Sequence, residues 1–463
     1  MSTVTVTNPF DGSTIEQVTK KSADELEQAL VNASQVFNDQ ENWLPTYERI
    51  SILEKTVEIM SSRVESLTKL AASEGGKPYM DSKTEVLRAI QGVKLAIEHI
   101  PQIKGEQIPM GLTESSSNRL AFTQREPIGV VMSVSAFNHP LNLIVHQTVP
   151  AIAVGCPVII KPSNSTPLSC LAFVKILHEA GLPENWCQAV VCAGVDAEKL
   201  VTDPRVNFFS FIGSARVGWM LRSKLAPGTR CALEHGGVAP VIVDESADLA
   251  MTVNSLLKGG FYHAGQVCVS VQRVYAQANI CENLANLLAT GAGELIVGDP
   301  LDPKTEVGPL ITPKEVDRVA QWVDEAIEKG GRLLTGGQRI SETCYAPTVI
   351  LDPPADCHLS QEEVFGPVIC VYSYEDKLEA VNRANSLPVA FQAAVYTQKL
   401  DDALQLSQKL NATAVMINDH TAFRVDWMPF GGRDSSGIGM GGIQYSMHEM
   451  TREKMTVIKS NIL

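Results

Sequence analysis

The chain has 463 residues, of which 44% are hydrophobic and 19% are charged, a balance typical of a folded protein with two or three domains. Its formal net charge is −14, and the acidic residues are spread along the chain rather than gathered in a tail. Nucleic acids and anionic membranes need basic patches on their partners, so this charge argues against both as partners.

The ten cysteines form no Cys-x-x-Cys pair and show no metal-ligand spacing. We therefore expect free thiols in a reducing cytoplasm and no bound metal. The N-terminus has no basic region followed by an apolar stretch, and no uncharged apolar run reaches the roughly 18–20 residues that a membrane span needs. The sequence thus predicts a cytoplasmic protein with no membrane partner.

Amphipathic helices come first, over 22–38 and 46–71, where apolar residues recur at the three-to-four spacing of one helical face. From 128 to 237, apolar β-branched runs alternate with helical segments, which predicts parallel βαβ units in a doubly wound sheet. Ligands of such sheets bind beyond the carboxyl ends of the strands. The predicted strands cover 128–134, 158–160, 189–192 and 207–211, and the predicted helices cover 141–154, 167–180 and 215–225.

A second α/β region is predicted over 239–433. Two further segments, 118–124 and 455–459, are predicted as isolated edge strands. In the second region the predicted strands cover 239–243, 271–275, 367–373 and 413–417, and the predicted helices cover 247–258, 313–329 and 400–410.

One cysteine and one upstream glutamate carry the clearest chemical signal. Cys268 lies in the run Phe-Tyr-His-Ala-Gly-Gln-Val-Cys-Val-Ser, and Glu234 lies in Leu-Glu-His-Gly-Gly. A thiolate can attack a carbonyl carbon, and a nearby carboxylate can then activate water. The alternatives are a buried, inert cysteine and a glutamate that forms a surface ion pair at the end of a strand.

Five further motifs accompany this pair along the chain. They are Ala-Phe-Asn-His-Pro at 136–140, Ile-Lys-Pro at 160–162, Phe-Ile-Gly-Ser at 211–214, Glu-Val-Phe-Gly-Pro at 363–367 and Pro-Phe-Gly-Gly at 429–432. In this order and at these separations the chain resembles the aldehyde dehydrogenase superfamily over nearly its whole length. The residues of these motifs are most similar to those of the branch that handles lactaldehyde, glyceraldehyde 3-phosphate and phosphonoacetaldehyde.

The resemblance implies an α/β fold with three parts. A Rossmann-type cofactor-binding domain would comprise 1–107 and 126–236, and a second α/β domain, the catalytic domain, would comprise 237–433. A small β piece for oligomerisation would comprise 108–125 and 434–463. A homodimer or homotetramer is expected on the same ground.

The resemblance also implies a mechanism for oxidising a small aldehyde to its acid. Cys268 would attack the aldehyde, and the resulting thioester would be hydrolysed by water that Glu234 activates. Asn138 would donate to the oxyanion together with the backbone N–H of Cys268. Asn138 also precedes the helix over 141–154 and could cap it, and the two roles can hold together. Two other functions stay open: a CoA-acylating enzyme, and a protein that keeps the fold without turnover.

NAD or NADP is the implied cofactor. The segment Gly213-Ser-Ala-Arg-Val-Gly218 follows a strand and opens a helix, where backbone N–H groups favour a phosphate. The resemblance places the cofactor pyrophosphate near Ser214. Glycines at such a turn can also serve the geometry alone.

The remaining cofactor residues come from two other motifs. Lys161 is expected to reach the adenosine ribose, Glu363 to bind the nicotinamide ribose hydroxyls, and Phe365 to pack beside the nicotinamide. The alternatives are a solvated lysine and a simple turn. Where the family often has a ribose-binding glutamate, this chain has Asn164 after Ser163, so we expect NADP to be tolerated.

The substrate pocket is expected to include Phe137, which replaces a common tryptophan, together with His139, Val267 and Val269. Members that bind phosphorylated substrates commonly have an arginine where Val267 stands, so a phosphate-bearing substrate is not favoured.

A second charged candidate lies in the segment 419–427, which resembles the family's specificity loop. Arg424 of this segment either contacts the substrate or pairs with Asp419 or Asp426. His235 stands where a leucine is common, and it either hydrogen-bonds near the site or points away from it.

Overall fold

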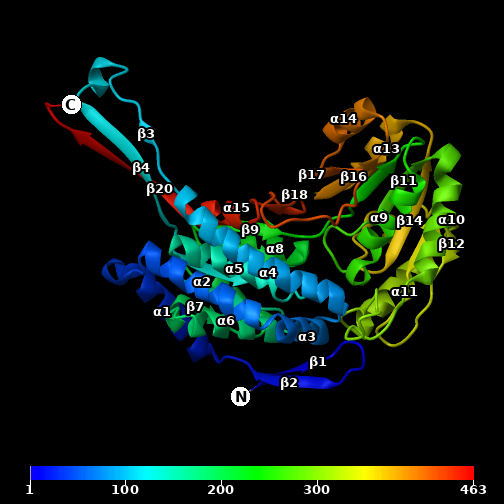
Figure 1. Cartoon of the computed structure of the whole chain (residues 1–463), viewed down its shortest axis with the longest axis horizontal. Helices are drawn as coiled ribbons and strands as arrows, with labels where there is room; N and C mark the ends of the chain where they lie inside the picture. The colour runs from blue at the N-terminus through cyan, green and yellow to red at the C-terminus, as the bar shows by residue number, and fades with distance from the viewer. Residues whose placement is uncertain (1, 463) are drawn as a thin grey trace.

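The computed structural model describes residues 2–462 and has two α/β lobes, with a β arm that projects from the first lobe (Figure 1). The first lobe is built on a six-stranded sheet in the order β19-β9-β8-β5-β6-β7. Strands β5 to β9 are parallel, and β19 is antiparallel to β9. The strands are β5 (Val130–Val134), β6 (Val158–Lys161), β7 (Cys187–Ala189), β8 (Val206–Ile212), β9 (Arg230–Glu234) and β19 (Gly437–Ile438).

Helices cover both faces of this sheet, which is why its strands read as continuous apolar runs. Met132 of β5 packs in the hydrophobic cluster of α1, α7 and α8, and neighbouring Val131 packs in the cluster of the opposite face. The first group is α1 (Ala23–Asn38), α7 (Gly194–Val201) and α8 (Ala215–Arg222). The second is α2 (Thr46–Ser62), α3 (Val64–Gly75), α4 (Tyr79–His99), α5 (Asn142–Val154), α6 (Leu168–Glu179) and α15 (Ile443–Glu449).

Two local predictions were wrong. The single helix predicted over 46–71 is two helices, α2 and α3, because the backbone leaves helical geometry at Arg63 (φ −116°, ψ 16°). The strand predicted over 189–192 is β7, which ends at Ala189. Its apolar run continues because Val191 is buried beneath the N-terminal hairpin of β1 (Thr3–Thr7) and β2 (Thr14–Thr19), not because the strand continues.

The second lobe is built on a seven-stranded sheet in the order β12-β13-β14-β11-β10-β16-β17, parallel except for β12. Its strands are β10 (Pro240–Val243), β11 (Arg273–Gln277), β12 (Arg332–Thr335), β13 (Thr348–Leu351), β14 (Val368–Tyr374), β16 (Gln392–Tyr396) and β17 (Ala414–Ile417). Its helices are α9 (Leu249–Phe261), α10 (Ala278–Glu294), α11 (Pro313–Glu328), α12 (His358–Gln361), α13 (Lys377–Ala384) and α14 (Leu400–Lys409). A short pair, β15 (Val389–Ala390) and β18 (Arg433–Asp434), lies outside both large sheets.

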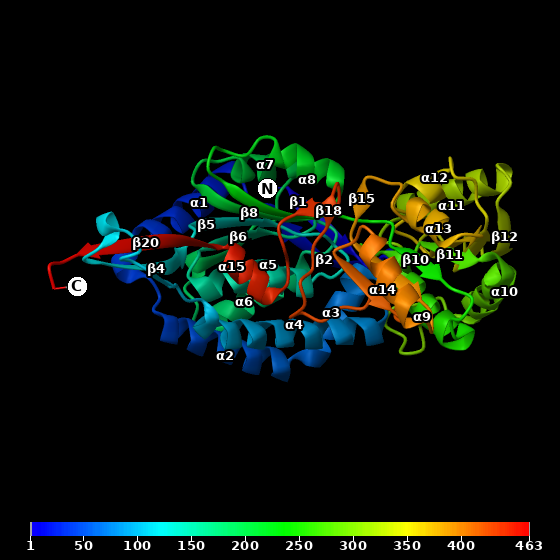
Figure 2. The same cartoon turned by 90° about the horizontal axis from the view of Figure 1, so that it is seen from above.

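The arm is a three-stranded sheet in the order β20-β4-β3. The two segments predicted as isolated edge strands pair with each other here, along the whole of β4 (Arg119–Pro127) and β20 (Thr451–Lys459), while β3 (Gln107–Ile108) pairs with the other side of β4. The arm and the second lobe lie at opposite ends of the molecule (Figure 2).

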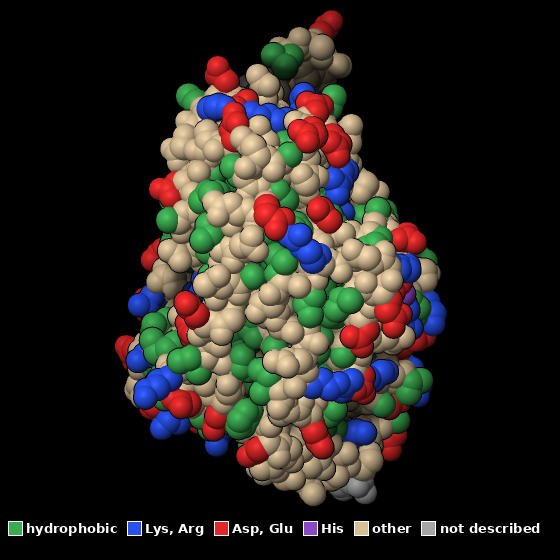
Figure 3. All heavy atoms as spheres, turned by 90° about the vertical axis from the view of Figure 1, so that its right-hand side faces the viewer, with side chains coloured by type: hydrophobic (Ala, Val, Ile, Leu, Met, Phe, Trp, Pro, Cys, Tyr) green, Lys and Arg blue, Asp and Glu red, His purple; other side chains and the backbone are tan. Residues whose placement is uncertain are grey.

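Charges of both signs are interspersed over the face that the second lobe turns outward (Figure 3). Within residues 2–462, no helix is long and apolar enough to cross a membrane. The same residues contain no cluster of three or more histidine, cysteine or acidic side chains arranged to hold a metal ion, and all ten cysteines, which lie in this range, are free.

The strand order fixes where a ligand can bind. In the first sheet the chain runs outward from β5 through β6 to β7. It then returns to β8, on the other side of β5, and runs outward to β9. β5 and β8 therefore flank the point where the strand order reverses. A crevice opens at the carboxyl ends of the strands at such a point. At this crevice, the segments that follow β5, β8 and β9 face the segments that precede β11 and β14 of the second lobe.

Candidate active site

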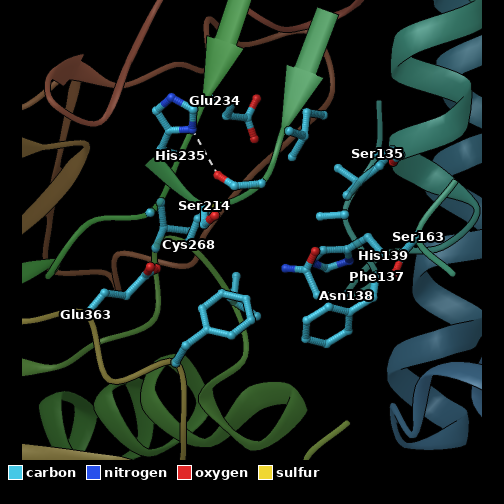
Figure 4. A pocket seen from close by; sticks show the side chains of 18 of the residues that line it. Ser135, Phe137, Asn138, His139, Ser163, Ser214, Glu234, His235, Cys268 and Glu363 are labelled. Atoms are coloured by element: carbon cyan, nitrogen blue, oxygen red, sulfur yellow. Dashed lines mark hydrogen bonds between the residues drawn. The ribbon is translucent and has the colours of Figure 1, made fainter. Parts of the chain in front are cut away.

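A cavity of about 490 Å³ lies where the two lobes meet. That volume is typical of a small-molecule site. In Figure 4, Glu234, Cys268 and Glu363 lie on one side of the cavity, and Phe137, Asn138 and His139 lie on the facing side. Most of the residues expected in the site line this cavity, namely Phe137, Asn138, His139, Ser163, Gly213, Ser214, Glu234, Val267, Cys268, Val269, Glu363, Phe365 and Arg424. Lys161, Asn164 and Gly218 do not.

Cys268 lies just before β11, between the buried side chains of Val267 and Val269. Burial raises the pKa of the Cys268 thiol well above its usual range, and the carboxylates of Glu234 and Glu363 raise it further. The resting side chain is therefore a neutral thiol, and it needs a base before it can act as a nucleophile.

Glu234 ends strand β9 and points into the same cavity. Burial raises the pKa of its carboxyl group to about 7, and the charge of Arg424 opposes that shift. A group with this pKa accepts a proton readily near neutral pH and can return it. The carboxyl group lies in the wall that also carries the thiol of Cys268.

Asn138 is buried and holds its side-chain amide across the cavity by donating through Nδ2 to the carbonyl of Gln266 at 2.9 Å. Gln266 lies in the segment that leads to Cys268, so this bond ties the amide to the loop that carries Cys268. The alternative role of Asn138 as a helix cap was wrong. The cap of α5 is the carboxylate of Glu85, which accepts from the backbone N–H groups of Leu141 and Asn142 at 2.9 and 3.0 Å.

The turn after β8 opens helix α8 at one end of the cavity. Ser214 is the N-cap of α8, and its hydroxyl makes no capping bond, so this oxygen is available to a ligand. Gly218 lies beneath the turn instead of in the cavity wall. A Cβ at this position would lie 2.0 Å from Cε1 of His235, so the glycine makes room for that ring.

Glu363 and Phe365 close the same end of the cavity from the second lobe. Burial raises the pKa of the Glu363 carboxyl group to about 8, and its Oε1 has no hydrogen-bond partner among residues 2–462. A Cβ on Gly236 would lie 1.9 Å from this carboxylate, so only glycine lets it approach the backbone there. Phe365 has φ +45°, rare for a bulky residue, and its ring meets the ring of Phe137 edge-on at 5.9 Å.

These features fit a nicotinamide dinucleotide. A buried, unpartnered carboxylate oxygen such as that of Glu363 matches the hydroxyls of a ribose, and a helix N-terminus such as that of α8 matches a phosphate. Lys161, at the end of β6, donates to the carbonyl of Pro162 at 2.8 Å and to Oδ1 of Asn164 at 3.2 Å. Neither of these two hydrogen-bond partners is a carboxylate.

Besides Arg318, two arginines line the cavity, Arg88 and Arg424, and they are linked through Asp426 and His146, whose Nδ1 accepts from Arg424 at 3.5 Å. Arg88, on α4, makes a bidentate pair with the buried Asp426, which also bonds to Nε2 of His146 at 2.8 Å. Arg424 lies over the ring of Phe430 at 3.5 Å from its centroid, and its Nε has no partner. It makes no ion pair with Asp419 or Asp426 within residues 2–462, so the pairing considered from the sequence is not formed.

His139 is held in the cavity wall by a buried ion pair. Nζ of Lys77 lies 2.7 Å from Nδ1 of His139 and 2.5 Å from the carboxylate of Glu85, and neither charged group is reached by solvent. Neither this pair nor Arg88 is predicted from the sequence, because the chain between 72 and 117 carries no recognised motif.

Known proteins place the chain among enzymes that oxidise aldehydes. The sequence profile described as "Aldehyde dehydrogenase family" matches residues 1–456, so the chain belongs to this family. It is an oxidoreductase that acts on aldehydes and uses NAD or NADP. The branch indicated by its motifs is confirmed as well.

Among its relatives is the 3-sulfolactaldehyde dehydrogenase of Priestia aryabhattai, which is 35% identical over 98% of this chain and 94% of that protein. Aldehyde dehydrogenase 21 from Physcomitrella patens, solved with its reaction product succinate, is 34% identical with a TM-score of 0.95 and covers 99% of this chain and 95% of its own. Glyceraldehyde-3-phosphate dehydrogenase GapN from Methanocaldococcus jannaschii, solved with NADP, is 36% identical with a TM-score of 0.94 and covers 99% of both chains.

Proposed function

We propose that this enzyme oxidises a short aldehyde carrying one negative charge at its far end, with NAD or NADP, and releases the carboxylic acid. The observation that carries this proposal is that Arg88 and Arg424 line the same cavity as Cys268 and Glu234. A cavity with a nucleophile at one place and guanidinium groups at another suits a substrate that is an aldehyde at one end and an anion at the other.

The charges around Arg88 and Arg424 favour a substrate with a single negative charge. Arg88 and Arg424 are cationic, and the carboxylate of Asp426 offsets one of them. Burial lowers the pKa of His146, which keeps its ring neutral. One positive charge remains, which suits a carboxylate or a sulfonate better than a phosphate dianion. The relatives' names, with sulfolactaldehyde as substrate and succinate as product, are in keeping with such a group.

The chain's own residues supply the covalent steps. The thiol of Cys268 gives up its proton to water in the cavity as its sulfur bonds to the aldehyde carbon, giving a thiohemiacetal whose oxygen carries negative charge. Asn138 and the backbone N–H of Cys268 donate to the oxygen that gains charge. A nicotinamide held beside Glu363 and Phe365 would supply the acceptor for the hydride on this carbon, and Cys268 would then carry a thioester. Glu234, still a carboxylate, then takes a proton from water as the water attacks the thioester. It returns this proton to the sulfur of Cys268 as the carbon–sulfur bond breaks, and the acid leaves with the thiol restored.

For the cofactor we propose Ser214 and Gly213 at the pyrophosphate, and Glu363 and Phe365 at the nicotinamide ribose and ring. Lys161, with Ser163 and Asn164, would lie at the adenosine ribose. Because Asn164 is neutral, no carboxylate at this position repels a 2′-phosphate, and we propose that NADP is accepted along with NAD.

The arm is the surface that we propose for self-association. Met455, Val457 and Ile458 of β20 are exposed hydrophobic residues, and their strand lies at the edge of its sheet. An apolar edge strand of this kind pairs readily with another chain. A homodimer or homotetramer built through the arm would cover it, and light scattering of the wild type and of a Val457→Lys variant would reveal the assembly.

The proposed function is tested with aldehydes matched in length and differing in charge. Succinic semialdehyde, which ends in a carboxylate, is compared with butanal by following the reduced cofactor, with NAD and with NADP. We expect higher kcat/KM for the charged aldehyde and a free acid as product whether or not CoA is present. Equal rates for the two aldehydes would contradict the proposed anion site, and an acyl-CoA product would contradict hydrolysis.

A further inference from the structure

His235 is a buried histidine that directly follows Glu234 and that the proposed chemistry does not use. Its side chain is only 1% exposed. Nδ1 lies 2.9 Å from the carbonyl oxygen of Gly213, and since a carbonyl can only accept, Nδ1 carries the proton and donates (Figure 4). Burial lowers the pKa of this ring, which keeps it neutral near pH 7.

The bond completes a two-sided hold on Gly213. The amide N–H of Gly213 donates to the carbonyl of Glu234 at 3.1 Å, while its own carbonyl accepts from His235. Both polar groups of the first residue in the turn are thus held by two consecutive residues, one of which is the proposed base. The backbone N–H of His235 is fixed in turn by the carbonyl of Ser436 at 2.9 Å.

The His235 ring is shaped into its place. The rings of Phe211 and Trp219 each lie with their centroids 5.6 Å from that of His235, at interplanar angles of 61°. Gly218 has no side chain, which leaves the space that Cε1 and Nε2 of His235 fill. A ring packed in this way against β8 and α8 cannot rotate freely, so the direction of the Nδ1–H donor is fixed.

The consequence lies in the next peptide group. The carbonyl of Gly213 and the N–H of Ser214 belong to one planar peptide and point in opposite directions. Holding the carbonyl with His235 therefore also sets the direction of the Ser214 N–H, at the start of α8 and in the wall of the cavity.

We propose that His235 is a positioning residue for the cofactor: through the carbonyl of Gly213 it fixes the turn at Ser214 that receives the cofactor phosphates. This inference rests on the proposed assignment of that turn to the cofactor.

The test compares His235→Leu with His235→Asn. Leucine fills a similar volume without a donor, whereas the asparagine amide nitrogen is one bond from Cγ, as Nδ1 is. Calorimetry without aldehyde measures the Kd for NAD and for NADP. We expect H235L to raise Kd and the cofactor KM by up to about tenfold, the value of one hydrogen bond, with kcat at saturating cofactor nearly unchanged. The Kd of H235N for the cofactor should lie within about threefold of the wild-type value, since the net free energy of a retained hydrogen bond varies by that much.

Unchanged Kd in H235L would overturn the inference. Equal loss of binding in H235L and H235N, together with a lower Tm in both, would also overturn it, because the ring would then act as filling alone. If H235L does not fold, His235→Gln replaces it, since this amide nitrogen lies farther from Cγ, and Gln must bind more weakly than Asn. Because binding is measured without aldehyde, this result is independent of whether the proposed substrate is the right one.

Discussion

Arg88 and Asp426 lie 338 residues apart in the chain and are joined by two hydrogen bonds of 3.0 and 2.8 Å. The pair ties α4 of the first lobe to the segment that carries Arg424. Because Arg88 satisfies Asp426, the guanidinium of Arg424 is left without an ion pair, and it remains available to a substrate anion.

Replacing Arg424 should therefore remove the preference for charged substrates. We expect Arg424→Met to lower kcat/KM for succinic semialdehyde by about 10- to 100-fold, the value of one charge-assisted hydrogen bond. Butanal turnover should change far less. The matched control is Arg318→Met, which changes another arginine of the cavity wall, one that bonds to the carbonyl of Val364 beside Glu363. It should leave the ratio of kcat/KM for succinic semialdehyde to kcat/KM for butanal unchanged. A ratio that stays constant in R424M would show that the anion binds elsewhere.

The hydrolytic step should depend on pH through Glu234. Its pKa is raised to about 7, so the carboxyl group is protonated below this pH and cannot accept a proton from water. The rate of acid release should rise with pH through about 7 and level off above it. Rapid quenching of the acylated enzyme over a series of pH values measures this step apart from acylation. A profile that is flat across this range would exclude Glu234 as the base.

Asn138 should matter to the rate and little to cofactor binding. Asn138→Ala removes the proposed donor to the oxyanion, and such a loss typically lowers kcat by about 10²–10³-fold. Asn138→Asp keeps the shape without the N–H and should be similarly slow. The Kd for the cofactor and the Tm serve as controls, because the bond from Asn138 to Gln266 is also lost. Normal kcat in both variants would remove Asn138 from the mechanism.

The buried pair of Lys77 and Glu85 should be important for stability. Lys77→Met leaves the Glu85 carboxylate without its cation in the interior, which costs about 3–5 kcal/mol of unfolding free energy. The double variant Lys77→Met, Glu85→Gln should recover part of this loss, since a glutamine oxygen can still accept from the N-terminus of α5. Urea unfolding of the three proteins measures the effect. A K77M protein as stable as the wild type would contradict this account.

The sequence predicted much of the first sheet because a strand covered by helices on both faces is largely apolar, as in β5 and β8. It did not predict α4, whose buried face includes the polar residues Asp81, Ser82 and Glu85 and so hides the helical period. Arg88 was missed for this reason, and its distant partner Asp426 offers no local signal.

Among the site residues, Cys268 and Glu234 were recognisable because each stands in a distinctive local motif. The contacts of His235 and Arg424 were left open. His235 bonds to the carbonyl of Gly213, and Arg424 lacks an ion pair because Arg88 takes Asp426. Only the folded chain brings these partners together.

The proposed hydrolysis of a Cys268 thioester by Glu234 can be observed most directly in a Glu234→Gln variant. Mixed with aldehyde and excess cofactor, this variant should give a burst of one reduced cofactor per site and then stall, with the acyl group found on Cys268 by mass spectrometry. The wild type should turn over steadily. Steady turnover in the variant, or a stalled enzyme without an adduct on Cys268, would contradict the account.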